Sequence, residues 1–202
     1  MKILTEKLLE TLLTNTVPKG RKLAGKDLSR MSLAGYDLSG YDLSGFNLSN
    51  TDLSNANLSS ANLQGATLEN TSLGCTDLTG ANLTDAKLVC VNLEGANLAG
   101  ANLTGAILRE SIVQDANLTG TTLTGVDLRG SFLLRTNFSN ANLEGADLRF
   151  SSLPNATLQG ANLTDANLQD ANLQGAKMLN ANLTGANLKG TKLNNTKTLQ
   201  KV

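Results

Sequence analysis

The sequence contains no histidine and few aromatic residues. Histidine is absent from all 202 residues, and aromatic side chains make up only 3% of them, with no tryptophan. Without histidine the chain lacks the commonest general acid–base catalyst and the commonest metal ligand of proteins. The shortage of rings also argues against a conventional globular core, because aromatic side chains supply much of the buried area there. Histidine-dependent catalytic triads and histidine-ligated metal sites are therefore excluded.

The sequence also lacks an excess of charge, a cysteine framework and long apolar runs. Seventeen Lys and Arg residues balance 17 Asp and Glu residues, which removes the simplest basis for binding nucleic acid or an anionic membrane. The two cysteines, Cys75 and Cys90, are too few for a disulfide scaffold. In the repeat described below they fall at outward turn positions, which we expect to lie too far apart for a disulfide bond. No run reaches the roughly 18 apolar residues of a membrane span, and no signal-peptide cleavage site is apparent. We expect a cytoplasmic protein with no transmembrane segment and two free thiols without a role.

A five-residue repeat fills most of the chain. From Leu23 to Leu193 an apolar residue recurs at every fifth position, 35 times in all, and 32 of these residues are leucine. A small residue, usually alanine, lies two positions earlier, and Gly, Asn, Ser or Asp often closes the unit. A period of five matches neither a helix nor a long strand, but it suits a chain that extends briefly, turns a corner and repeats. Such units bury little alone and must stack on one another.

The repeat A(D/N)LxG, as in Ala-Asn-Leu-Thr-Gly at 101–105, closely resembles the pentapeptide-repeat family over about 171 residues. The resemblance implies an all-β solenoid, a right-handed quadrilateral parallel β-helix of about nine coils with four pentapeptides per coil. Residues 20 apart would then stack in one column. On this basis the repeats occupy residues 21–195. An N-terminal α-helical cap and linker would precede them in residues 1–20, and a C-terminal tail would follow in residues 196–202.

The two ends of the expected solenoid differ in how they are closed. Residues 2–17 are predicted as a helix with one broad leucine-rich arc, ended by Pro18. We interpret it as a cap over the sheet edge rather than a membrane-surface or partner helix. Large residues fill the inward small-residue positions of the first coil and are expected to plug the core: Met31, Tyr36, Tyr41 and Phe46. The C-terminal end is less well covered, which makes it the better candidate for self-association as a homodimer.

No pattern in the sequence indicates an enzyme or a cofactor site. Most carboxylates occupy outward repeat positions, where a solvated ladder explains them. The glycines recur with the repeat rather than in a phosphate-binding GxGxxG or Walker loop, and the aspartates lack the spacing of an EF-hand loop. We therefore expect no catalytic residues, no cofactor and no bound metal.

Outward residues between 107 and 154 depart from the repeat. Arg109, Arg129 and Arg149 are 20 residues apart and should form a vertical ladder about 5 Å apart, with Asp127 and Asp147 on the same flank. Around them the outward positions become apolar, and Ile107 and Pro154 extend the apolar set. The candidate protein-binding residues are Arg109, Arg129, Arg149, Ile112, Phe132, Leu134 and Phe150. Apolar side chains with interspersed arginines are typical of protein-binding surfaces; the alternative is that they merely cover one another across coils.

Three functions fit these observations. The leading hypothesis is a non-enzymatic scaffold, regulatory in role, that binds an unidentified protein partner through one lateral face and does not bind nucleic acid directly. The family resemblance also implies an alternative, because some pentapeptide-repeat proteins mimic duplex DNA and bind DNA gyrase, giving quinolone resistance. Here residues 31–105 hold seven acidic residues and one lysine, a net charge of −6. We interpret this acidic lower half as a solvated surface rather than as a DNA mimic.

The third hypothesis is a secreted effector that associates with membranes through its N-terminal helix. The resemblance also suggests a cyanobacterial source, since such proteins are abundant in cyanobacteria and some there influence cell differentiation.

Overall fold

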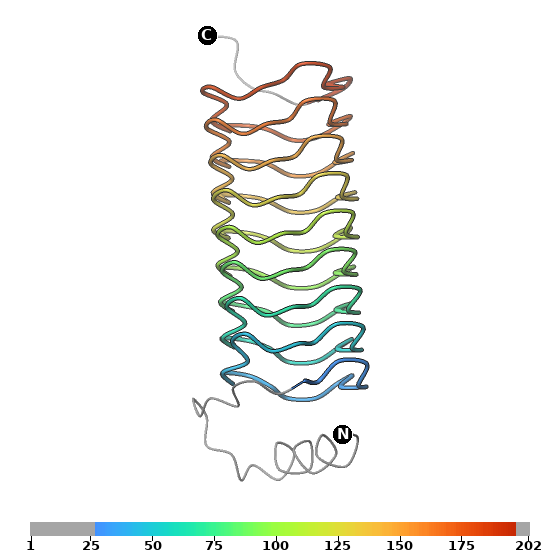
Figure 1. The fold of residues 1–202 in the computed structure, drawn as a ribbon. Helices are drawn as coiled ribbons and strands as arrows, with labels where there is room; N and C mark the ends of the chain where they lie inside the picture. Colours follow the sequence, from blue (N-terminus) through green and yellow to red (C-terminus); the bar gives the residue numbers. More distant parts are fainter. Residues whose placement is uncertain (1–26, 197–202) are drawn as a thin grey trace.

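The computed structural model describes residues 27–196, which form one tall, four-sided solenoid (Figure 1). The predicted cap and linker at 1–20 and most of the predicted tail lie outside the described residues. Within 27–196 there is no helix and no strand longer than one bridging residue. Isolated parallel bridges join residues 20 apart instead, from Asp27↔Asn47 to Asn172↔Lys192. Each side of the solenoid is thus a narrow parallel sheet with one bridge per coil.

The four sides, or faces, are numbered in chain order by their central apolar residues. Face 1 runs from Leu28 to Leu188, face 2 from Leu33 to Leu193, face 3 from Leu38 to Met178 and face 4 from Leu43 to Leu183, each in steps of 20. The 34 described repeat units make eight and a half coils at four units per coil. The predicted fold, a right-handed quadrilateral parallel β-helix, is confirmed.

Backbone hydrogen bonds join every coil to the next. The Leu33 amide donates to the Asp52 carbonyl over 2.7 Å, and the Asp52 amide donates back to the Met31 carbonyl over 2.9 Å. Within the unit, the Tyr36 amide donates to the Leu33 carbonyl over 3.3 Å and closes the corner. This pattern recurs along the solenoid, so the short extended segments satisfy their polar backbone groups without long strands.

Every corner turns at a residue with positive φ. All 34 units have such a residue at their fifth position, 16 of them glycine and 18 not. Eleven of the 18 are Asn or Asp, which tolerate this left-handed conformation better than other side chains do. Close approach adds a second constraint at Gly185, where a Cβ would lie 2.0 Å from Oδ1 of Asp165 in the coil below. The turn residues of the repeat are therefore required by backbone geometry.

The interior is a continuous column of leucine and small residues. The central residues of the middle coils are at most 1% exposed, including Phe138 in place of leucine on face 3. At the C-terminal end the coil from Ala181 to Leu193 has no described coil above it. Its inward residues are half-buried, and Leu193 is 42% exposed. The C-terminal end of the described solenoid is therefore open.

Large side chains occupy the interior of the first coil, at the positions predicted to plug it. Tyr41 and Phe46 are buried, while Met31 and Tyr36 are half-buried and pack against the core. Each lies at the inward small-residue position of a different face. Their role as a plug remains a prediction, because the cap expected beside them lies outside the described residues.

Candidate functional site

The predicted site residues lie together on faces 1 and 2. On face 1, each central residue from 108 to 148 is followed by one of the arginines, Arg109, Arg129 and Arg149. On face 2, Ile112 and Phe132 precede central residues, and Leu134 follows one. Phe150 lies at the corner between the two faces. We call this set of seven residues the lateral patch. The repeat places all seven on three successive coils, as the 20-residue register predicted.

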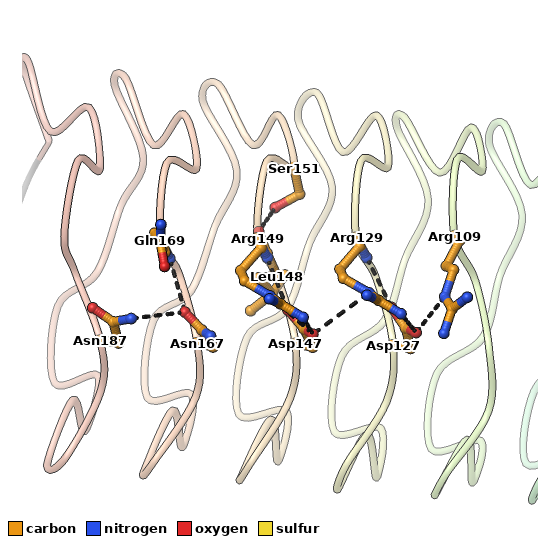
Figure 2. A network of polar contacts seen from close by, with 10 residues as sticks. All are labelled: Arg109, Asp127, Arg129, Asp147, Leu148, Arg149, Ser151, Asn167, Gln169 and Asn187. Carbon is orange, nitrogen blue, oxygen red and sulfur yellow. Dashed lines mark hydrogen bonds and ion pairs between the residues drawn. The ribbon is translucent and has the colours of Figure 1, made fainter.

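The three arginines and two aspartates of face 1 form a continuous ion-pair ladder (Figure 2). Nε of Arg109 donates to Asp127 Oδ2 over 2.5 Å from the coil below. Nε and Nη2 of Arg129 donate to the same carboxylate over 2.9 and 2.8 Å. One coil higher, Arg149 Nη2 donates to Asp147 Oδ2 over 2.7 Å, and Arg129 Nε lies 3.5 Å from that oxygen. Each aspartate thus lies between two arginines.

The ladder keeps both aspartates ionised. Burial raises the pKa of Asp127, but the hydrogen bonds from Arg129 and Arg109 outweigh that effect and hold its pKa at about 2. The pKa of Asp147 is also below its ordinary value, because the Arg149 hydrogen bonds and the charge of Arg129 outweigh burial. The ion pairs therefore persist at physiological pH and restrict the positions of the guanidinium groups.

The apolar residues of the lateral patch remain accessible to solvent. Ile112 and Phe132 are bridge partners on face 2, and they are 39% and 56% exposed. Phe150, at the corner above, is 63% exposed, whereas Leu134 and Pro154 are half-buried. Contact between coils thus covers part of Leu134 but leaves more than half of Phe132 and of Phe150 exposed.

Backbone strain concentrates at the corners after faces 1 and 2. Seven corner residues with positive φ are neither glycine nor Asn or Asp. Six of them follow face 1 or face 2, namely Arg30, Cys75, Cys90, Glu110, Arg135 and Phe150, and only Ser60 follows face 3. The left-handed conformation costs such residues about 1–2 kcal/mol each. Residues held in strained conformations cluster at functional sites, and Phe150 belongs to the lateral patch.

A second ion pair beside the lateral patch was not singled out by the sequence analysis. Nε and Nη2 of Arg135 donate to the two carboxylate oxygens of Asp115, over 2.6 and 2.7 Å. The Arg135 hydrogen bonds lower the pKa of Asp115. The two residues are 20 apart, so the same register that revealed the arginine ladder could have revealed this pair.

A column of buried hydroxyl groups lies inside face 2, behind the lateral patch. Ser111 Oγ donates to the Leu88 carbonyl over 2.8 Å, and Ser131 Oγ donates to the Leu108 carbonyl over 2.6 Å. Lower in the same column, Thr51 and Thr71 bond carbonyls of the coils beneath them in the same way. The sequence analysis described this position only as one for a small residue, usually alanine. They cross-link the corner between faces 1 and 2 from coil to coil, directly beneath Ile112 and Phe132.

Other candidate chemistry is limited within residues 27–196. Cys75 and Cys90 are exposed and free, as the sequence analysis expected. Across the described coils, no group of three His, Cys, Asp or Glu side chains could hold a metal ion. The lateral patch is the site in this part of the chain where exposed apolar groups, fixed charges and backbone strain coincide.

Comparison with known proteins places the chain in a family. The Pentapeptide repeats family matches in eight overlapping copies, over residues 37–74, 61–98, 76–115, 86–125, 116–149, 123–160, 141–178 and 161–197. No curated protein matches the chain.

Several solved structures share the architecture. One is HetL, a pentapeptide repeat protein involved in heterocyst differentiation regulation from the cyanobacterium Nostoc sp. strain PCC 7120, with 31% identity, a TM-score of 0.62 and 95% of each chain covered. Another is a trypsin-treated variant of QnrB1, a plasmid-mediated fluoroquinolone resistance protein, with 19% identity, a TM-score of 0.58 and 87% of each chain covered. The likeness to QnrB1 shows the fold alone. The chain is a member of the pentapeptide-repeat family.

Proposed function

We propose that this protein is a non-enzymatic scaffold that binds a protein partner through the lateral patch. The observation that carries the proposal is the pair of phenyl rings, Phe132 and Phe150, more than half exposed beside arginines fixed by ion pairs. Aromatic and arginine side chains dominate the energetics of protein interfaces. Because the arginines are already held in place, ordering them on binding costs little additional conformational entropy.

The charge balance of this surface favours a protein over a nucleic acid as the partner. Four arginines (109, 129, 135 and 149) are matched on faces 1 and 2 by four acidic residues (110, 115, 127 and 147), and Asp115, Asp127 and Asp147 bond arginines directly. Nucleic-acid binding relies on cations that replace the counterions of the phosphates. Arg129, Arg135 and Arg149, which already bond carboxylates of their own, supply little of that driving force.

We also propose that this scaffold has a regulatory role in the cytoplasm. HetL, 31% identical over nearly the whole chain, is described as involved in heterocyst differentiation regulation, which supports a regulatory scaffold here. The exposed thiols Cys75 and Cys90 suit a reducing compartment.

The described residues give less support to the two alternative functions. Acidic residues of the lower coils lie on different faces, with Asp52 on face 2, Asp37 on face 3 and Asp42 on face 4, whereas a mimic of duplex DNA needs one continuous acidic face. The membrane-effector hypothesis depends on residues 1–20, which lie outside the described part. Between residues 27 and 196, no helix is long and apolar enough to cross a membrane.

A homodimer through the C-terminal end is a second proposal. It is supported by Leu179 and Leu193, which are exposed on the last two described coils. If this end mediates dimerisation, Leu193→Lys should lower the molar mass measured by light scattering from dimer to monomer. An unchanged mass, or a wild-type protein that is already a monomer, would refute the dimer.

Site-specific photocrosslinking tests the lateral patch directly. Phe132→p-benzoylphenylalanine places a reactive ring where a ring already stands, and Asn102→p-benzoylphenylalanine on face 4 is the matched control. In cells of the source organism we expect a covalent protein adduct from position 132 and none from position 102. That adduct protein should be retained by wild type in a pull-down and lost with Phe132→Asp/Arg129→Glu, once melting has shown that the variant is folded. Lack of an adduct specific to position 132 would refute the proposed face.

A further inference from the structure

The arginine ladder has one positive charge more than its aspartates neutralise. It contains three arginines but two aspartates, because Ile107 stands where the repeat would place a partner for Arg109. Arg109 therefore reaches up to Asp127, which it shares with Arg129. Among the described residues, Nε is the one atom of its guanidinium that makes a hydrogen bond, and the side chain is 47% exposed. The four N–H groups on its terminal nitrogens are available to an acceptor.

A second cation lies at the same end of the ladder. Lys87 is the bridge partner of Ile107 on the coil below, and its side chain is exposed. Within residues 27–196 it takes part in no ion pair. Lys87 lies about 5 Å from Ile107 on the coil below, and Arg109 follows Ile107 by two residues, at the start of the turn. The two cations therefore flank Ile107.

The nearby acidic side chains are directed elsewhere. Glu94 accepts a hydrogen bond from Gln114 Nε2 over 2.7 Å. Cys90 Sγ lies 4.0 Å from Oε2 of Glu110, and Cγ of Glu110 lies 3.8 Å from the position that a Cβ on Gly130 would occupy. Neither glutamate forms an ion pair with Lys87 or Arg109 in the described coils. An incoming anion would therefore not have to displace an internal partner.

We propose that the partner's contact segment carries a carboxylate next to a large apolar side chain. The carboxylate would bind between Lys87 and Arg109 on face 1. The apolar side chain would pack on Ile112 and Phe132, which lie on the neighbouring face 2. This inference rests on the proposed function and specifies its partner. A guanidinium with free terminal nitrogens matches the planar carboxylate group. The exposed ring of Phe132 beside it favours an apolar side chain next to that carboxylate, whereas a nucleic acid would present another phosphate there.

A random peptide library tests the inference without knowledge of the natural partner. The probe is a phage-displayed dodecapeptide library, selected on the full-length protein and on Phe132→Asp. Peptides that bind wild type but not Phe132→Asp should be enriched in Asp or Glu beside an aromatic or aliphatic residue. Selection on Lys87→Glu/Arg109→Glu should replace these acidic residues by Lys or Arg. Phe132-dependent peptides without acidic enrichment would refute this inference alone, whereas a selection that yields no Phe132-dependent peptides would count against the proposed function itself.

A synthetic peptide from the wild-type selection then gives a quantitative test by calorimetry. We expect Lys87→Gln/Arg109→Gln to weaken its binding about tenfold or more, as for loss of a charge-assisted contact. Lys177→Gln on face 3 is the matched control and should leave affinity unchanged. An Asp→Asn or Glu→Gln peptide should lose affinity for wild type but not for the double variant. Equal losses for both proteins would overturn the inference, as would tight binding of a labelled DNA 20-mer that depends on Lys87 and Arg109.

Discussion

Faces 3 and 4 differ from faces 1 and 2, although the backbone of all four is the same. On face 4 the outward positions form a simple amide ladder, in which Asn82 Nδ2 donates to Asn62 Oδ1 over 3.0 Å and Asn162 Nδ2 donates to Asn142 Oδ1 over 2.9 Å. The corners after faces 3 and 4 use glycine, Asn or Asp, with Ser60 as the exception. Faces 3 and 4 therefore show the regular form of the repeat, with mostly amide side chains outward and Gly, Asn or Asp at the corners.

Faces 1 and 2 combine three departures from that pattern. Exposed rings and an ion-pair ladder replace amides, strained corners such as Phe150 replace glycine or asparagine, and five of the eight buried hydroxyl residues line the interior of face 2. Strained backbone positions cluster at functional sites, and three of the strained corners, Glu110, Arg135 and Phe150, lie in the coils of the lateral patch. The difference between the faces therefore supports the proposed binding surface in addition to its composition.

The largest expected effect lies at the central apolar positions, where the faces should not differ. Leu103→Asp on face 4 and Leu133→Asp on face 2 each place an unpaired carboxylate at a fully buried position. We expect each to reduce the free energy of unfolding by about 3–5 kcal/mol, measured by urea denaturation followed by circular dichroism. Asn102→Ser, an outward change beside Leu103, should alter it by less than about 0.5 kcal/mol. Unchanged melting of Leu103→Asp would show that the inward assignment is wrong.

The buried hydroxyl column should produce the next largest effect. Ser131→Ala removes the one hydrogen-bond donor that the Leu108 carbonyl has among the described residues. Leaving that buried acceptor unsatisfied should cost about 1–3 kcal/mol of unfolding free energy. Ser139→Ala on face 3 removes an outward hydroxyl that bonds Asn137 and should cost less than about 0.5 kcal/mol. Equal losses would mean that the column does not distinguish face 2.

Relief of strain should stabilise the corner between faces 1 and 2. Phe150 has a φ of +60°, and Phe150→Asn replaces it with a residue that adopts this conformation more readily, so we expect a gain of about 1–2 kcal/mol. The gain should appear as a higher Tm in calorimetry, together with weaker partner binding. The reverse exchange, Asn140→Phe at the corner after face 3, should lower Tm. If Phe150→Asn also lowered Tm, the ring would be a structural element rather than a binding one.

The smallest expected effect is the pH dependence from the ion-pair ladder. The pKa of Asp127 is about 2 in the folded protein, against an ordinary value of 3.8. A lowered pKa contributes stability above the unfolded value, and this contribution is lost as the pH falls from about 4 to about 2. Because the ladder is partly exposed, the loss should be about 1 kcal/mol. Denaturation at several pH values should show a shallower acid limb for Asp127→Asn, and identical limbs would contradict the pairing.

Much of the lateral patch was predictable because the 20-residue register converts sequence position into surface position. Arg109, Arg129 and Arg149 were placed in one column with Asp127 and Asp147 on the same flank, and the structure joins these residues by ion pairs. Arg135 was missed, although the same spacing links it to Asp115. The hydroxyl of Ser131 was missed for a different reason, since its acceptor is a backbone carbonyl 23 residues away. A repeat pattern does not show which acceptor a buried hydroxyl group bonds.

By itself, the sequence determined the architecture of this protein. An apolar residue at every fifth position allows one solution in which all of them are buried, a coil of short segments stacked on its neighbours. Only the tertiary structure decided which outward side chains remain exposed and which carboxylate each arginine bonds. These features depend on side-chain direction and on contacts between coils, and the periodicity specifies neither.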